Sequence, residues 1–199
     1  MHMKPYHIIR MEKPDWNKAE KVELFHQPWL TPCAIRAWAQ LCHDGENLYV
    51  RMEAEEENIR ATVTDALSAV CADSCLEFFF APMAGDKRYL NFELNKLGTA
   101  YVGFGAERKT RMRLILKNPA DLLQPMPFET DKGWGIEFRI PATFVKLFFP
   151  EVSFSGEAAG NFYKCGDLTE TEHYLAWSPM TSETPDFHRR QDFGTLVFE

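Results

Sequence analysis

Apolar and polar residues alternate with a period of two along much of the chain, and this alternation predicts short β-strands. The clearest segment covers residues 47–55, where every second position is apolar: Leu48, Val50, Met52 and Ala54. A strand of this kind buries one face and leaves the other polar. Similar segments lie at residues 35–41, 75–81, 89–95, 100–104, 112–116, 134–140, 161–165 and 195–198. Turns rich in Gly, Pro, Asp and Asn separate them, which is typical of a sandwich or barrel of strands.

Helical periodicity is scarce by comparison. Residues 142–149, which follow Pro141, and residues 56–69 are compatible with short helices. No βαβ unit and no phosphate-binding glycine loop is visible. The pattern therefore predicts an all-β fold, an antiparallel β-sandwich of jelly-roll type with one or two short helices. A length of 199 residues without linker or repeat fits one domain spanning residues 1–199.

Two neighbouring strands, at residues 75–81 and 89–95, carry most of the information about function. Each has apolar residues at alternate positions: Leu76, Phe78 and Phe80 on the first, and Leu90, Phe92 and Leu94 on the second. If the strands pair as a hairpin with both apolar sets in one core, the parity of the register is fixed. The opposite face then collects Glu77, Asn91 and Glu93, and the simplest register places Glu77 directly across from Glu93.

Like charges in directly opposed positions destabilise a sheet by up to about 1 kcal/mol. Two interpretations of the Glu77–Glu93 pair remain open from the sequence. In the first, Arg88, Arg108 or Lys164 neutralises a solvated face. In the second, the face is a polar binding surface whose carboxylates accept hydrogen bonds from hydroxyl groups.

Composition and charge exclude several classes of partner. Hydrophobic and charged contents of 45% and 26% are ordinary for a globular domain. A net charge of −7 argues against nucleic acid, because phosphate binding needs clustered cations. No apolar run is long enough to span a bilayer, so we expect no membrane partner. The N-terminus has no apolar stretch resembling a signal peptide, so we expect a cytoplasmic protein, or a secreted one whose leader has been removed.

The sequence assigns no metal ligand and no cofactor. The cysteines lack the spacing of a zinc site and are expected to be idle or buried thiols: Cys33, Cys42, Cys71, Cys75 and Cys165. The histidines are scattered along the chain in the same way.

A series of short motifs runs in order along nearly the whole chain. They lie at residues 15–16, 44–50, 73–79, 89–95, 133–134, 140–141, 160–167, 174–179, 186–189 and 193–196. In this order they resemble the family-9-like carbohydrate-binding modules, which are relatives of the wider DOMON-type β-sandwiches. The run Asp-Ser-Cys-Leu-Glu-Phe-Phe at 73–79 is similar to the family's hallmark strand.

The resemblance implies a β-sandwich with a shallow sugar site. In such modules two tryptophans sandwich a terminal sugar, while carboxylate, amide and basic side chains bind its hydroxyl groups. Glu77 matches the hallmark glutamate, and Trp177, which precedes Ser178 and Pro179, is the expected stacking ring. The segment 66–72 has no tryptophan for the second wall. The resemblance also allows a structural calcium ion.

The expected ligand-binding residues are therefore Glu77, Arg88, Asn91, Glu93, Asn161, Lys164 and Trp177. Each has a structural alternative. Trp177 would instead plug one end of the core, and Lys164 would form an ion pair with Glu77 or Glu93. The basic run at residues 188–190 would either recognise an acidic sugar or form local ion pairs with nearby aspartates. The roles of Trp29 and Trp38 are left open, with a structural role favoured, and Trp134 is expected in the core.

The leading hypothesis is non-catalytic binding of a mono- or oligosaccharide through an aromatic platform and the polar sheet face. One alternative is a glycoside-processing enzyme that uses Glu77 and Glu93 as acid and base, since directly paired residues lie roughly 5 Å apart. Another is a divergent sandwich domain with a structural or interaction role. Haem binding, for which Met52, Met83, Lys164 and His173 are the available ligands, is a further alternative.

Overall fold

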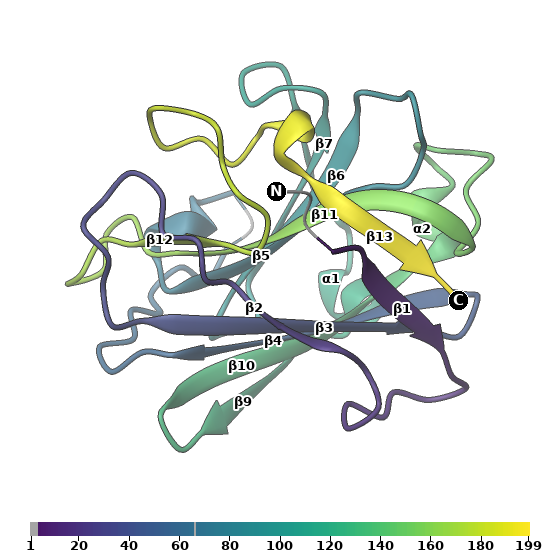
Figure 1. The fold of residues 1–199 in the computed structure, drawn as a ribbon. Helices are drawn as coiled ribbons and strands as arrows, with labels where there is room; N and C mark the ends of the chain where they lie inside the picture. The colour runs from purple at the N-terminus through teal and green to yellow at the C-terminus, as the bar shows by residue number, and fades with distance from the viewer. Residues whose placement is uncertain (1–3, 66) are drawn as a thin grey trace.

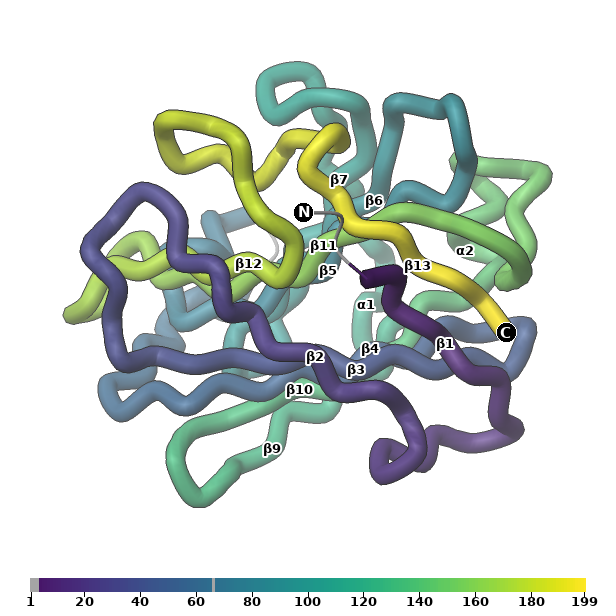
Figure 2. The backbone as a smooth tube through the Cα atoms, viewed as in Figure 1, coloured from purple at the N-terminus to yellow at the C-terminus, as the bar shows by residue number. Residues whose placement is uncertain are grey.

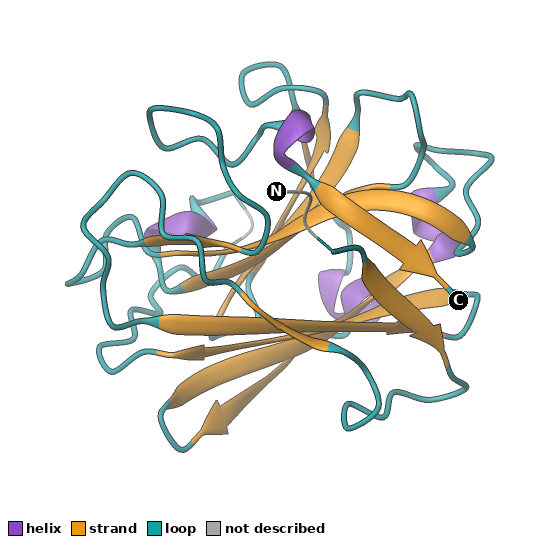
Figure 3. Cartoon of the chain, in the orientation of Figure 1, coloured by secondary structure: helices purple, strands orange, loops and turns teal. Residues whose placement is uncertain are grey.

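The computed structural model describes residues 4–65 and 67–199, and it is a β-sandwich (Figure 1). In chain order its strands are β1 (Tyr6–Arg10), β2 (Lys21–Glu23), β3 (Arg36–His43), β4 (Asn47–Glu55), β5 (Cys75–Ala81), β6 (Tyr89–Asn95), β7 (Ala100–Gly105), β8 (Met112–Leu114), β9 (Met126–Thr130), β10 (Gly133–Pro141), β11 (Gly156–Cys165), β12 (Tyr174–Ala176) and β13 (Gly194–Phe198). Strands dominate the described chain (Figure 3), so the prediction of an all-β fold is confirmed.

The strands form one curled sheet in the order β8-β7-β6-β5-β11-β13-β1-β3-β4-β10-β9. Its two halves face each other as the layers of the sandwich. Two further strands lie beside this order, since β12 pairs with β11 and β2 pairs with β3. Most pairs are antiparallel, but β1 pairs in parallel with both β13 and β3. The first strand therefore joins the two layers, beside the last strand of the chain (Figure 2).

The core fills the space between the layers with alternate residues of each strand. In β4 the four apolar positions are buried and the five between them are half-buried, as the period of two predicts. Trp134 of β10 is fully buried in the same core, which confirms its expected place. The core therefore follows directly from the alternation in the sequence.

The hairpin of β5 and β6 has the simplest register, with Phe78 opposite Phe92 and Glu77 opposite Glu93. The expectation of an exposed polar face is wrong, however, since every residue of both strands is buried. A second apolar cluster covers this outer face, and Phe79, Tyr163 and Phe187 belong to it. The polar residues between the phenylalanines consequently lie beneath loops.

Helices are few and short. They are α1 (Pro119–Leu123), α2 (Ala142–Val145) and the 3-10 helices η1 (Val70–Ala72) and η2 (Arg190–Asp192). Helix α2 lies within the expected segment 142–149. The described residues of 56–69 contain no helix, and Ala66 lies outside the described residues. None of the described helices has the length and hydropathy needed to cross a bilayer.

Candidate functional site

A small pocket of about 80 Å³ opens on the outer face of β5, β6 and β11. Its lining residues are Trp29, Cys71, Glu77, Glu93, Arg108, Arg111, Cys165, Asp167, Tyr174, Pro185, Asp186, Phe187 and His188. The strands supply the two glutamates and Cys165, while loops supply the aromatic and basic residues. The hairpin thus places the carboxylates at the base of the pocket, and the loops decide what surrounds them.

Glu77 and Glu93 are 3% and 5% exposed, and each keeps a hydrogen bond from a neighbour. The Cys165 thiol donates to Glu77 Oε1 at 2.9 Å, and Asn91 Nδ2 donates to Glu93 Oε1 at 2.9 Å. The Asn91 Oδ1 atom is buried and has no hydrogen-bond partner among the described residues. Glu77, Asn91 and Glu93 therefore share one face as expected, but Asn91 is fully buried and does not line the pocket itself.

Burial governs the electrostatics of this pair. It raises the pKa of Glu77 well above its ordinary value, and the facing Glu93 carboxylate raises it further. Burial also raises the pKa of Glu93 to about 7, although the nearby Arg111 guanidinium opposes the shift. Arg111 is held in place because its Nε donates to the Tyr101 hydroxyl at 3.2 Å. The balancing cations are thus loop arginines rather than Arg88 or Lys164.

Trp29 forms an aromatic wall that the sequence did not assign. Its ring centroid lies 5.4 Å from that of Phe187 and 5.6 Å from that of Tyr174, and its Nε1 donates to the Ser182 carbonyl at 2.8 Å. The Trp29 backbone has φ 74°, a left-handed conformation that is rare for a bulky residue. The only signal in the sequence was a tryptophan directly after Pro28, in a segment that predicts neither strand nor helix.

Trp177 is not the exposed stacking ring that the sequence suggested. It is 5% exposed and packs in the main core, edge-on to Tyr6 at 6.0 Å and tilted against Phe162 at 5.5 Å. Its backbone N–H donates to the Phe162 carbonyl at 3.0 Å, so the chain continues beside β11 with the indole turned into the sandwich. The alternative interpretation of Trp177, in which it fills one end of the core, is therefore the correct one.

Asn161 is fully buried and fixes a loop. Its Nδ2 donates to the carbonyls of Ser178 at 3.2 Å and Asp192 at 3.3 Å, and its Oδ1 accepts from the Ser178 N–H at 2.9 Å. These bonds hold the ends of residues 178–192, the segment that carries Phe187 and His188. Asn161 does not line the pocket, so it shapes the site only through the loop.

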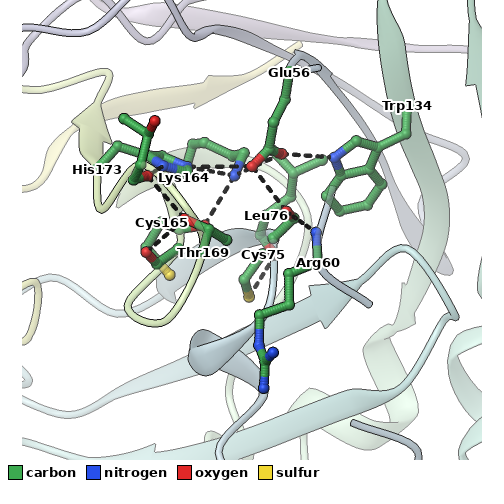
Figure 4. A network of polar contacts seen from close by, with 12 residues as sticks. Glu56, Arg60, Cys75, Leu76, Trp134, Lys164, Cys165, Thr169 and His173 are labelled. Carbon is green, nitrogen blue, oxygen red and sulfur yellow. Dashed lines mark hydrogen bonds and ion pairs between the residues drawn. The ribbon is translucent and has the colours of Figure 1, made fainter. Parts of the chain in front are cut away.

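Lys164 lies on the core side of β11, away from Glu77. It is fully buried, and its Nζ is 3.1 Å from Glu56 Oε2 and 2.6 Å from His173 Nε2 (Figure 4). Glu56 also accepts hydrogen bonds from Trp134 Nε1 at 3.2 Å and from the Ser74 hydroxyl at 2.8 Å. The expected ion pair of Lys164 therefore exists, but its partner is Glu56 because Lys164 shares the parity of Phe162.

His173 in this cluster is neutral. Its Nδ1 faces the Thr171 carbonyl at 2.6 Å and must donate, which leaves Nε2 to accept from the Lys164 ammonium. Burial lowers the pKa of His173 to about 4, and the Lys164 charge lowers it further. The cluster of Glu56, Lys164 and His173 is thus a satisfied buried network.

Arg88 also lies outside the pocket. Its Nη2 pairs with Asp86 Oδ2 at 2.6 Å at the tip of the hairpin, and its guanidinium lies over the rings of Phe104 and Phe149 at 5.4 and 5.5 Å. Residue 88 has the parity of the core-facing positions of β6, so it points away from Glu93. Its expected contact with the polar face is therefore wrong.

The basic run at residues 188–190 forms mostly local interactions. The Nδ1 atom of His188 lies 2.9 Å from the Tyr89 hydroxyl, and Arg189 pairs with Asp192 at 3.0 Å. Burial lowers the pKa of His188 to about 3, and Arg111 and Arg108 lower it further. His188 lines the pocket as a neutral ring, while Arg189 holds the loop through Asp192.

The carboxylate of Asp73 does not fit a structural calcium ion, although it is the least exposed acidic side chain in the described chain. Its oxygens accept from the N–H groups of Thr62 and Val63 at 2.8 Å and from Asn95 at 2.9 Å, and Arg60 lies 3.3 Å away. Donors and a cation already surround it. Asp73 therefore organises the loop that precedes β5.

A β-sandwich with acidic and aromatic side chains meeting in one outer pocket is a form typical of carbohydrate-binding modules. The chain belongs to carbohydrate-binding family 9, whose profile matches residues 6–198. No curated protein matches the chain. The resemblance inferred from the motifs is therefore confirmed.

Solved structures with this fold agree with the assignment. A protein from Bacteroides uniformis, proposed to bind carbohydrate, superposes with a TM-score of 0.82 at 29% identity, over 100% of this chain and 99% of that chain. A family 9 module from Caldicellulosiruptor kristjanssonii in complex with glucose gives a TM-score of 0.66 at 12% identity, over 98% of this chain and 96% of its own. The complex of such a module with cellotriose gives 0.64 at 12% identity, over 98% and 94%. At 12% identity these two likenesses show the fold alone.

Proposed function

We propose that this domain is a non-catalytic module that binds a mono- or oligosaccharide in the pocket between Trp29 and the Glu77–Glu93 pair. The observation that carries the proposal is the meeting of two opposed carboxylates with aromatic rings in one pocket. Membership of carbohydrate-binding family 9 supports a carbohydrate ligand. The glucose and cellotriose complexes of modules with the same fold support it further.

The chemistry of the lining suits a sugar. Carboxyl oxygens accept hydrogen bonds from vicinal hydroxyl groups, and both Glu77 and Glu93 line the pocket. The faces of Trp29 and Tyr174 offer apolar surface for the C–H patch of a pyranose ring. Arg111 adds N–H donors for ring and hydroxyl oxygens.

The size of the pocket limits the ligand to part of one sugar residue. A volume of about 80 Å³ does not enclose a whole oligosaccharide, so the terminal residue enters and the rest stays in solvent. Such a site buries little ligand surface, and a dissociation constant on the order of micromolar to millimolar is expected.

Isothermal titration calorimetry with glucose, galactose, xylose, cellobiose and cellotriose tests the proposal. At least one sugar should give saturable heat, and Trp29→Ala should abolish it. Trp38→Ala is the matched control, because Trp38 lies on β3 under Lys21 and Arg36, in the other layer. Folded protein that gives no heat with any sugar would overturn the proposal, as would equal binding by the Trp29→Ala variant. Release of the chromophore from an aryl glycoside would overturn the non-catalytic assignment.

A further inference from the structure

The fold brings together a sulfur-rich cluster that the sequence spacing does not reveal. Cys75 on β5 and Cys165 on β11 are directly paired across the two strands, and Glu77 lies two residues along β5 on the same face. One ligand atom from each of the three residues lies within 4.8 Å of the other two, and all three residues are buried. Among the described residues, this is the one group of His, Cys, Asp or Glu side chains close enough together to hold a metal ion.

The two thiols have only modest partners. Cys165 Sγ lies 2.9 Å from Glu77 Oε1 and 3.7 Å from the Cys71 carbonyl, while Cys75 Sγ makes a long contact of 3.9 Å with the Leu76 carbonyl. No disulfide links them, since both cysteines are free. The two thiols also hydrogen-bond each other, so on metal binding the sulfurs exchange these hydrogen bonds for bonds to the cation.

A path for entry of an ion lies beside the cluster. The pocket is lined by Cys71 and Asp167 as well as by Glu77 and Cys165, so an ion arriving through it meets these side chains first. The Asp167 N–H donates to the Cys71 carbonyl at 3.0 Å, which holds the segment after β11 against η1. Cys71 and Asp167 are not among the residues whose ligand atoms lie within 4.8 Å of one another, so a water molecule from the pocket completes four-coordination.

We propose that Cys75, Cys165 and Glu77 form a binding site for a zinc ion. Two thiolates and one carboxylate with an open fourth position are a ligand set that suits tetrahedral Zn²⁺, because thiolates select soft and borderline metals over calcium or magnesium. On binding, each thiol loses its proton to solvent as its sulfur bonds to the metal. The dication also offsets the charge that Glu77 and Glu93 bring into a shared buried position.

The site goes beyond the proposed sugar binding but shares Glu77 with it. Zinc on Glu77 removes an acceptor from the sugar pocket, so zinc and sugar compete for that carboxylate. The two proposals fail separately, because Trp29 is not one of the three metal ligands. A Trp29→Ala variant that loses sugar but keeps the metal separates them.

Titration of the reduced, chelator-treated full chain with Co²⁺ tests the zinc site. We expect one equivalent to produce a thiolate-to-cobalt charge-transfer band, and added Zn²⁺ to remove it. Cys75→Ser and Cys165→Ser should each weaken binding at least tenfold and reduce the band. Cys42→Ser is the matched control, since Cys42 is equally buried but lies on β3 in the other layer. Absence of the band, or an unchanged band in Cys75→Ser, would overturn the proposal.

X-ray absorption of the zinc-loaded wild-type protein keeps the test decisive if the cysteine variants fail to fold. Two or more sulfur neighbours at about 2.3 Å are expected. A zinc ion with only nitrogen and oxygen neighbours would show that the metal binds elsewhere and would overturn the assignment.

Discussion

Glu77 and Glu93 face each other across β5 and β6 beneath a cover of aromatic loops. Opposed like charges destabilise a sheet even at its surface, and here burial raises the pKa of both carboxyl groups, which lowers their charge at a desolvation cost. The hydrogen bonds from Cys165 and Asn91 offset only part of that cost. The pair therefore does not serve stability, and the proposed sugar binding would give it a role.

Glu93→Gln should separate binding from stability. The amide keeps the shape of the carboxylate but loses a charged acceptor, so sugar affinity should fall about 10- to 100-fold, equivalent to about 1.5–3 kcal/mol. The melting temperature should stay level or rise, because one of two opposed buried acids is gone. Calorimetric titration and thermal unfolding of the same sample measure both. A variant with a much lower melting temperature would contradict this account of the pair.

Gly103→Ala should disturb the same site from the neighbouring strand. Residue 103 on β7 is paired with Asn91, and a methyl group there would lie 2.4 Å from Asn91 Oδ1 and 3.1 Å from the Tyr101 ring. The amide of Asn91 must move, and its bond to Glu93 is lost. We expect weaker sugar binding and a loss of about 1–3 kcal/mol of stability, since overpacking has this cost. Gly85→Ala cannot serve as a control, because the positive φ of Gly85 would itself strain an alanine. Wild type is therefore the reference.

The two tryptophans should behave in opposite ways. Trp177→Ala removes a core indole and should lower the free energy of unfolding by about 3–5 kcal/mol, while the folded fraction keeps its affinity for sugar. Trp29→Ala should abolish sugar binding and cost less stability, because its ring is only half-buried. Urea unfolding and calorimetry on both variants check this. Loss of sugar binding in a fully folded Trp177 variant would contradict the assignment of the pocket.

The buried pair of Lys164 and Glu56 should matter for folding rather than for binding. Lys164→Met leaves an unpaired carboxylate in the core and should cost about 3–5 kcal/mol, and adding Glu56→Gln should recover part of it. Lys21→Met is the control, because Lys21 forms a surface pair with Glu53 at 2.6 Å and should contribute at most about 1 kcal/mol. Urea unfolding of the four proteins measures the difference. A double variant less stable than Lys164→Met would contradict the prediction.

Acid should destabilise the fold through His173. The unfolded side chain has a pKa near 6.5, whereas the folded one is lowered to about 4, chiefly by burial. Below pH 6.5 the unfolded His173 therefore takes up a proton that the folded one does not, so its contribution to stability falls as the pH falls, whereas the raised pKa values of Glu77 and Glu93 act in the opposite direction. His173 alone should account for a loss of about 1.5 kcal/mol between pH 6.5 and pH 5.

Urea unfolding at several pH values measures this slope. His173→Gln should flatten it partly, and His188, whose pKa is also lowered, should account for some of the remainder. The groups facing His173 are the Lys164 ammonium and the Glu56 carboxylate. An unchanged slope in the variant would show that the ring does not titrate as described.

The sequence predicts the central hairpin because alternation fixes parity. Once Phe78 and Phe92 share a core, Glu77 and Glu93 must share the other face. The same rule places Lys164 with Phe162 in the core, so the signal for its true position was present in β11. The expectation that Lys164 forms an ion pair with Glu77 did not take this parity into account.

The loops carry what alternation cannot predict. Trp29, Arg111 and Phe187 reach the pocket from segments that form no regular strand, and only tertiary contacts such as the bond from Trp29 to the Ser182 carbonyl place them. The second apolar cluster could not be predicted for the same reason. The sequence of a strand that is buried on both faces does not show which loops cover its outer face. For a site that loops build on a sheet, the sequence therefore predicts the strand residues but not the loop residues.

The left-handed backbone at Trp29 has a consequence for recognition. A bulky residue in that region costs on the order of 1–2 kcal/mol, and this cost arises when the chain folds, long before any ligand arrives. The indole is then fixed by Ser182 and Phe187. A ligand that stacks on the indole finds the ring already oriented, so the Trp29 side chain loses little rotational freedom on binding.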